Sequence, residues 1–250
     1  MTPARPNSSF APGSVALVGA GPGDADLLTL RAIQRLQAAE VVLYDDLAGE
    51  DFMSFVAPEA ELVAVGKRAG HPSPRQDEVS RLLVAYARSG KRVVRLKAGD
   101  PAVFARSDEE LRAVRDAGIA VEIVPGITTA TAAAAALGAS LTKRGVARRV
   151  QLVTGHDVDG RLPDDLDIAA LADPAATTCI YMGKATFPAL VERLLAHGLA
   201  PSTPAAIVES LGSPETRVIQ GTIVDIAAQL ASDRPQGACM ILYGMALAPR

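Results

Sequence analysis

The chain has 250 residues, with 25 Lys plus Arg against 28 Asp plus Glu and a net charge of −3. This balance argues against a dedicated nucleic-acid-binding protein, because such domains are usually basic. Two cysteines, Cys179 and Cys239, are too few for a disulfide framework or a cysteine-rich zinc site. No apolar run approaches the roughly 20 residues that a membrane span requires. We therefore expect a soluble, cytoplasmic protein with no metal, membrane or nucleic-acid partner.

The first half of the chain alternates short apolar runs with helical patterns, which is typical of parallel strands joined by crossover helices. Helices are expected at 27–38, at 73–88 and from 107 to about 117, and Ser73 and Ser107 each open a capping-box pattern. The expected strands are 15–19, 41–44, 61–65, 92–96 and 120–124.

The second half repeats this style, so the fold class is α/β with two lobes. Helices are expected at 130–137, 187–197 and 223–231, with strands at 149–154, 177–182, 204–208 and 238–243 and a further possible strand at 217–220. The stretch 156–174 holds six Asp and three Gly or Pro, which favours a loop. We predict a loose tail over 1–13, one lobe over 14–125, a second over 126–250, and a ligand cleft between the lobes.

A glycine-rich loop, Gly19–Asp24, follows the first predicted strand and would let a ligand approach the backbone closely. Asp45 and Asp46 follow the second strand, where a nucleotide-binding fold often places a ribose-binding carboxylate. Pro22 and Asp24 depart from the dinucleotide fingerprint, and an acidic side chain beside a pyrophosphate is repulsive. A tight turn without any ligand is the alternative interpretation.

A second turn, Leu96–Pro101, follows the fourth predicted strand and contains Gly99 and Asp100. Both loops should lie at the carboxyl edge of one sheet, so we expect them to be neighbours. Two acidic, glycine-containing loops at one edge suit a cationic or neutral ligand better than a phosphate.

Two groups of cations contain no acid among them. Such groups are usually solvated surface, but their position after predicted strands or at a lobe boundary favours binding of a polyanion. The first comprises Lys67, Arg68, His71 and Arg75, and the second Lys143, Arg144, Arg148 and Arg149.

Eight short motifs occur in a fixed order between about Ser14 and Gly244, and together they resemble the motifs of a known family. They occupy 19–24, 42–45, 65–70, 93–101, 124–128, 141–144, 153–156 and 181–183. In this order the sequence resembles the uroporphyrinogen-III C-methyltransferases, in their stand-alone form, within the tetrapyrrole methyltransferase family.

The resemblance implies a homodimeric enzyme that binds S-adenosylmethionine between two lobes and releases S-adenosylhomocysteine. It would methylate uroporphyrinogen III at C2 and C7 to give precorrin-2, a precursor of sirohaem and cobalamin. Asp45 matches the family's proton acceptor and Lys67 its proton donor. The residues matching the donor site are Pro22, Ala98, Gly99, Asp100, Val103, Thr128, Thr129, Met182 and Leu211.

The tetrapyrrole is a polycarboxylate, so local cations should recognise it; the candidates are Arg68, His71, Arg106 and Arg144. The sequence departs from the family pattern at Ala98, at Ala105 with Ser107 and Asp108, and at Leu211. Two alternatives remain at this point: a sister enzyme that methylates a later precorrin, and a nicotinamide-dependent oxidoreductase or nucleotide sensor. Asp24 and Asp100 count against the second.

Overall fold

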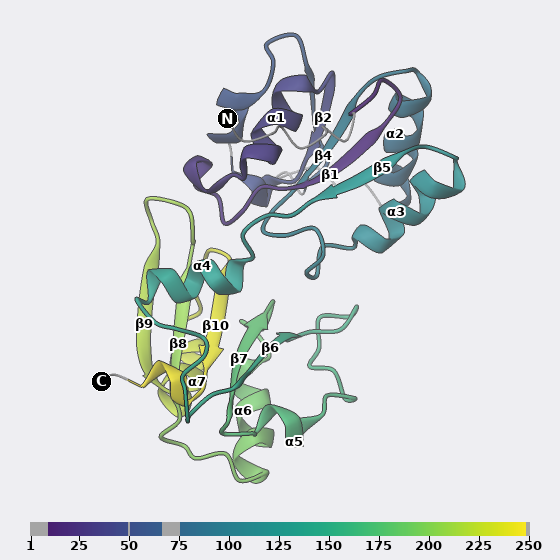
Figure 1. Ribbon diagram of the computed structural model, residues 1–250. Helices are drawn as coiled ribbons and strands as arrows, with labels where there is room; N and C mark the ends of the chain where they lie inside the picture. The colour runs from purple at the N-terminus through teal and green to yellow at the C-terminus, as the bar shows by residue number, and fades with distance from the viewer. Residues whose placement is uncertain (1–9, 50, 67–75, 249–250) are drawn as a thin grey trace. The chain divides into compact units, whose positions relative to one another are not determined.

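A computed structural model describes residues 10–49, 51–66 and 76–248 of the chain (Figure 1). The chain divides into two compact units, 1–128 and 129–250. The predicted lobe boundary fell between 125 and 126. The predicted N-terminal tail lies mostly outside the described residues.

The first unit is built on a five-stranded sheet in the order β3-β2-β4-β1-β5, in which every neighbouring pair is parallel. Parallel pairing confirms the crossover pattern expected for this half. The strands are β1 (Val15–Gly19), β2 (Val41–Tyr44), β3 (Glu61–Ala64), β4 (Val93–Lys97) and β5 (Val121–Val124), and the helices are α1 (Leu30–Ala38), α2 (Gln76–Arg88) and α3 (Ser107–Asp116).

The two faces of this sheet are covered by different helices, because side chains alternate along each strand. Ala16 and Val18 of β1 pack in the cluster that contains Leu36 of α1. Val15 and Leu17 pack in the opposite cluster, with residues of α2 and α3. The first unit is therefore a three-layer arrangement with α1 on one face and α2 and α3 on the other (Figure 1).

Helix boundaries differ from the prediction where a side chain or turn intervenes. A short 3-10 turn occupies Ala25–Leu27, and α1 starts only at Leu30, because the Thr29 side chain accepts a hydrogen bond from the Ala32 amide at 3.2 Å. The capping box expected at Ser73 lies outside the described residues.

The second unit also contains a five-stranded sheet, in the order β6-β7-β10-β8-β9, but here the expectation of parallel strands is wrong. Only the β6–β7 pair is parallel, and the other three pairs are antiparallel. The strands are β6 (Arg149–Thr154), β7 (Ala176–Tyr181), β8 (Pro204–Glu209), β9 (Arg217–Thr222) and β10 (Cys239–Tyr243).

Helices cover both faces of the second sheet. Helix α4 packs on the face that carries Cys179, Val208 and Leu242. The other three helices pack on the opposite face, around Ile180 and Ile207. The helices are α4 (Thr129–Ala136), α5 (Ile168–Leu171), α6 (Phe187–Ala196) and α7 (Ile223–Ser232), and the short α5 lies inside the stretch predicted to be mostly loop.

Candidate functional site

Three loops meet at the carboxyl edge of the first sheet. Gly21 and Gly99 form an isolated bridge, with the Gly99 amide donating to the Gly21 carbonyl at 2.7 Å and the reverse bond at 3.1 Å. This confirms that the glycine-rich loop and the turn after β4 are neighbours. A Cβ atom on Gly19 would lie 2.6 Å from backbone atoms of both Gly99 and Gly126, so these strand ends pack backbone on backbone.

Asp100 ties this edge together through its carboxylate. One oxygen accepts the Ala102 amide at 2.7 Å and the other accepts the Gly126 amide at 2.9 Å. The Val103 amide in turn donates to the Asp100 carbonyl at 3.1 Å. Asp100 therefore orders the turn through hydrogen bonds to backbone amides, whatever else it contacts.

Asp45 follows β2 at the same edge and is ion-paired with a cation from β4. Nη2 of Arg95 lies 2.7 and 2.8 Å from its two carboxylate oxygens. The Asp45 side chain remains 31% exposed, whereas Arg95 is only 3% exposed. Asp45 therefore sits at the surface end of a buried ionic group.

Glu110 of α3 anchors this group from behind, and it is fully buried. Its carboxylate accepts Nε of Arg95 at 3.1 Å, Nζ of Lys97 at 2.9 Å from both oxygens, and Nε2 of Gln76 at 2.9 Å. Burial alone raises the pKa of Glu110, but the charges of Arg95 and Lys97 outweigh it, so the net pKa is lowered. Burial and the nearby Arg95 lower the pKa of Lys97 more than Glu110 raises it.

The prediction of a capping box at Ser107 is wrong. Arg106, in a left-handed conformation with φ of 52°, precedes the helix and makes no side-chain cap, while Ser107 is already helical. The Ser107 hydroxyl is buried and has no hydrogen-bond partner among the described residues, and Glu110 turns inward to the cations of β4. Glu110 does not cap the helix because its carboxylate is hydrogen-bonded to the buried Arg95 and Lys97.

In the second unit, hydrogen bonding and packing bring together the ends of two strands and the start of α4. The Ala130 amide, next to Thr129, donates to the Tyr181 hydroxyl at 3.3 Å, next to Met182. Leu211 and Tyr181 both pack against the core cluster that contains Ala130. Thr129, Met182 and Leu211 thus belong to one region of this unit.

Backbone strain marks the same strand ends. Met182, directly after β7, has φ of 55°, and Ser210, directly after β8, has φ of 51°. Phe104, next to Val103 in the first unit, has φ of 49°. Non-glycine residues with positive φ are uncommon. They cluster at functional sites, since the surrounding structure must hold the backbone in this strained conformation.

The predicted substrate cations fall into three groups. Arg68 and His71 lie outside the described residues, as does Lys67, the predicted proton donor. Arg106 is ion-paired with Glu109, with Nε and Nη2 at 2.7 and 2.9 Å from its carboxylate oxygens. Arg144 is exposed in the turn between Lys143 and Ala147.

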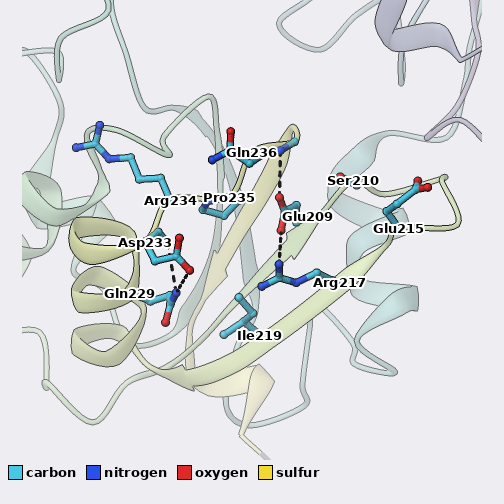
Figure 2. Close-up of a pocket in the computed structure, with 11 residues that line it drawn as sticks. Glu209, Ser210, Glu215, Arg217, Ile219, Gln229, Asp233, Arg234, Pro235 and Gln236 are labelled. Atoms are coloured by element: carbon cyan, nitrogen blue, oxygen red, sulfur yellow. Dashed lines mark hydrogen bonds and ion pairs between the residues drawn. The ribbon is translucent and has the colours of Figure 1, made fainter.

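A pocket of about 340 Å³ opens in the second unit (Figure 2). The mostly buried Glu209 accepts the Gly237 amide at 3.0 Å and lies 3.7 Å from a guanidinium nitrogen of Arg217. None of the predicted site residues lines this pocket. Its lining residues are Glu209, Ser210, Glu215, Arg217, Ile219, Gln229, Asp233, Arg234, Pro235, Gln236 and Gly237.

Within residues 10–49, 51–66 and 76–248, no group of three or more His, Cys, Asp or Glu side chains could hold a metal ion. No helix in these same ranges has the length and apolar character needed to cross a bilayer.

Comparison with known proteins decides the family. The family model of the tetrapyrrole (corrin/porphyrin) methylases matches residues 14–227. The chain belongs to this family. Among solved structures, the tetrapyrrole methylase fold of this chain is shared by a uroporphyrin-III C-methyl transferase from Thermus thermophilus complexed with S-adenosylhomocysteine. That match has a TM-score of 0.79 and 37% identity, and covers 94% of this chain and 98% of the other.

A cobalt precorrin-4 methyltransferase matches with a TM-score of 0.84 and 30% identity, over 98% of this chain and 99% of the other. A chloroplastic S-adenosylmethionine-dependent uroporphyrinogen III methyltransferase from Arabidopsis thaliana is 44% identical over 93% of this chain. A sirohaem synthase from Tolumonas auensis is 47% identical over 93% of this chain. The tetrapyrrole methylase chain spans 63% of the first of these two relatives and 49% of the second.

The sequence pattern did not identify Arg95, Lys97 or Glu110 as candidate site residues, although they form the ionic group behind Asp45. A signal was present, because the central strand Val93–Lys97 carries two cations among apolar residues and is buried along its whole length. Charges in such a strand need partners.

Proposed function

We propose that this tetrapyrrole methylase transfers methyl groups from S-adenosylmethionine to C2 and C7 of uroporphyrinogen III, giving precorrin-2. One observation carries the proposal: the 37% identity to the Thermus uroporphyrin-III C-methyl transferase extends over 98% of that chain. The same structure holds S-adenosylhomocysteine, the product expected from this donor. The 44% identity to the Arabidopsis enzyme supports the same substrate.

The residues proposed to contact the donor are placed within each unit by itself: in the first unit they lie at the three strand ends, and in the second they lie beside the strained turns. Pro22 and Ala98 flank the Gly21–Gly99 bridge, and Gly99 has φ of 67°. Asp100 and Val103 belong to the turn after β4. The remaining donor residues in the proposal are Thr128, Thr129, Met182 and Leu211.

The chemistry needs alignment more than activation. A pyrrole ring carbon attacks the donor's methyl carbon, the carbon–sulfur bond breaks, and its electron pair stays on sulfur as S-adenosylhomocysteine. The ring then carries a positive charge until it loses one proton. Asp45 is proposed to accept that proton and to stabilise the cation before its loss. Lys67 is proposed as the proton donor by resemblance alone.

Recognition of the tetrapyrrole is proposed to depend on cations, because the substrate is a polycarboxylate and the protein is itself slightly anionic. Arg144 is exposed and available, whereas Arg106 must exchange Glu109 for a substrate carboxylate. Arg68 and His71 complete the proposed set. We also propose that the protein is cytoplasmic and acts as a homodimer. Light scattering after gel filtration measures the oligomeric state directly.

A second candidate is methylation of a later precorrin, favoured by the TM-score of 0.84 to the cobalt precorrin-4 methyltransferase. Incubation with S-adenosylmethionine and either uroporphyrinogen III or a later precorrin separates the two. The proposal requires two methyl groups incorporated per uroporphyrinogen III, measured by mass spectrometry. Methylation of the later precorrin alone would overturn it. Titration with S-adenosylhomocysteine and with NAD tests the oxidoreductase alternative.

A further inference from the structure

Arg95 uses every nitrogen of its guanidinium group on a different partner. Nη2 contacts both oxygens of Asp45, Nε donates to Glu110 at 3.1 Å, and Nη1 donates to the Leu96 carbonyl at 2.9 Å. The guanidinium plane is therefore fixed on three sides. A carboxylate held by such a group has a defined orientation.

Stability alone does not account for this group. Four formal charges, on Asp45, Arg95, Glu110 and Lys97, lie together, and three of these side chains are at most 4% exposed. Apolar residues of similar volume usually stabilise a core as well as buried ion pairs do, or better. Val93, two residues before Arg95 on the same face of β4, packs in an ordinary apolar cluster.

The position of the group is informative. It lies at the carboxyl end of the first sheet, where β2 and β4 are neighbours, and only its Asp45 end is substantially exposed. The single positive charge of Arg95 faces two carboxylates, those of Asp45 and Glu110. Lys97 balances the second of these negative charges, because its Nζ donates to both oxygens of Glu110 at 2.9 Å. The buried partners thus support one partly exposed carboxylate from behind.

We propose that Arg95 is a positioning residue that holds the Asp45 carboxylate in its working orientation, with Glu110 and Lys97 fixing Arg95 in turn. The inference rests on the proposed function, because it assigns Asp45 its role in methyl transfer. A positioning role of this kind acts on turnover, since misplacing a reacting group by about 1 Å can cost on the order of 100-fold in rate.

Arg95→Lys tests the inference, because an ammonium group keeps the charge but cannot reach Asp45, Glu110 and the Leu96 carbonyl together. We expect kcat to fall about tenfold or more, with the KM for S-adenosylmethionine changed less than about threefold. In an Asp45→Asn background the same substitution should change kcat less than about twofold, because the group that it positions is gone.

Arg35→Lys is the matched control. Arg35 is also a buried arginine of the first unit, 6% exposed in its side chain, and it is ion-paired with Glu122 of β5. This variant should lose comparable thermal stability while keeping kcat. If Arg35→Lys lowers kcat as much as Arg95→Lys does, the positioning inference is overturned, because the effect then follows destabilisation in general.

Asp45→Glu covers the case in which Arg95→Lys does not fold. It keeps the charge but moves the carboxylate by one methylene, so kcat should fall about tenfold although the fold is retained. The positioning role of Arg95 is overturned if Asp45→Glu keeps full kcat. It is also overturned if Arg95→Lys lowers kcat equally in the wild-type and Asp45→Asn backgrounds. Either result leaves the proposed role of Asp45 in methyl transfer unchanged. A wild-type protein that does not methylate uroporphyrinogen III overturns the proposed function itself.

Discussion

A single nitrogen of Arg95, Nη2, lies within 2.8 Å of both carboxylate oxygens of Asp45, and this pairing changes what a substitution of the aspartate should do. Asp45→Asn should lower turnover by about 10²–10⁴-fold, the usual effect of losing a positioned acid or base. The free energy of unfolding should also fall, by about 1–3 kcal/mol, because Arg95 loses a charged hydrogen-bond partner. Single-turnover kinetics and urea denaturation measure the two effects.

Affinity for S-adenosylhomocysteine serves as the internal control for Asp45→Asn, and calorimetry should find it within about threefold of wild type. Wild-type turnover in this variant would remove Asp45 from the mechanism.

Ala98→Gly should be tolerated. The φ of Ala98 is not positive, so glycine relieves no backbone strain there and the free energy of unfolding should change by no more than about 1 kcal/mol. Gly126→Ala is the contrasting variant, since its Cβ would collide with the Gly99 carbonyl oxygen and the Gly19 backbone. It should cost about 1–3 kcal/mol and weaken S-adenosylhomocysteine binding. Equal stability and affinity for the two variants would contradict the backbone packing of these strand ends.

The decrease in the free energy of unfolding at acidic pH should depend on Glu110. Because its net pKa lies below the usual 4.5, this carboxylate stabilises the fold above about pH 4.5 and loses that contribution as the pH falls through its folded value. Glu110→Gln should therefore be less stable than wild type by about 3–5 kcal/mol at pH 7, with the gap narrowing below pH 4.5. Urea denaturation at several pH values measures the gap. Glu109→Gln, an exposed neighbour on α3, should show a gap of at most about 1 kcal/mol at every pH.

Charge reversal at Arg144 should separate the two ligands. Arg144→Glu is expected to raise the KM for uroporphyrinogen III several-fold and to leave S-adenosylhomocysteine affinity unchanged. Raising the salt concentration should weaken substrate binding in the same selective way, because the Debye length falls from about 10 Å at 0.1 M to about 3 Å at 1 M. Arg161→Glu, on an exposed loop of the same unit, is the control and should keep the wild-type KM. An equal effect of Arg144→Glu on both ligands, or on neither, would make this arginine ordinary solvated surface.

The two cysteines should resist thiol reagents in the folded protein. Burial raises the pKa of Cys179 to about 12 and that of Cys239 to about 11, so almost no thiolate is present at pH 8. A chromogenic disulfide reagent should label neither thiol rapidly under native conditions and both after denaturation. Rapid native labelling of one thiol would show that its surroundings open readily.

The sequence predicted the elements well where apolar runs and helical periodicity were strong. The strands Val15–Gly19, Val41–Tyr44 and Arg149–Thr154 begin and end where the pattern placed them. The antiparallel pairs of the second sheet were missed, because the order of strands in a sheet depends on long-range packing. The predicted capping box at Ser107 failed for another reason, since the Glu110 carboxylate that it needs is hydrogen-bonded to the buried Arg95 and Lys97.

For the candidate site, the pattern predicted which loops would meet but not which charges would pair. Two glycine-containing loops after strands predicted the Gly21–Gly99 contact, since parallel strands share one carboxyl edge. The Arg95–Glu110 pair joins a strand to a helix, and a local spacing rule cannot distinguish such a glutamate from one facing solvent. The roles of Asp45 and of the donor residues stay predictions.

The strand order of the first sheet sets a condition on synthesis at the ribosome. Strand β1 lies between β4 and β5, so Val15 finds its partners only at Val93 and Val121. At about 5–20 residues per second, β1 emerges on the order of 4–16 s before β4 does. During that interval an entirely apolar strand has both edges unpaired, which is the state most exposed to aggregation. Demand for chaperones should therefore be greatest on nascent chains that stop before Val93, and should fall once Val124 has emerged.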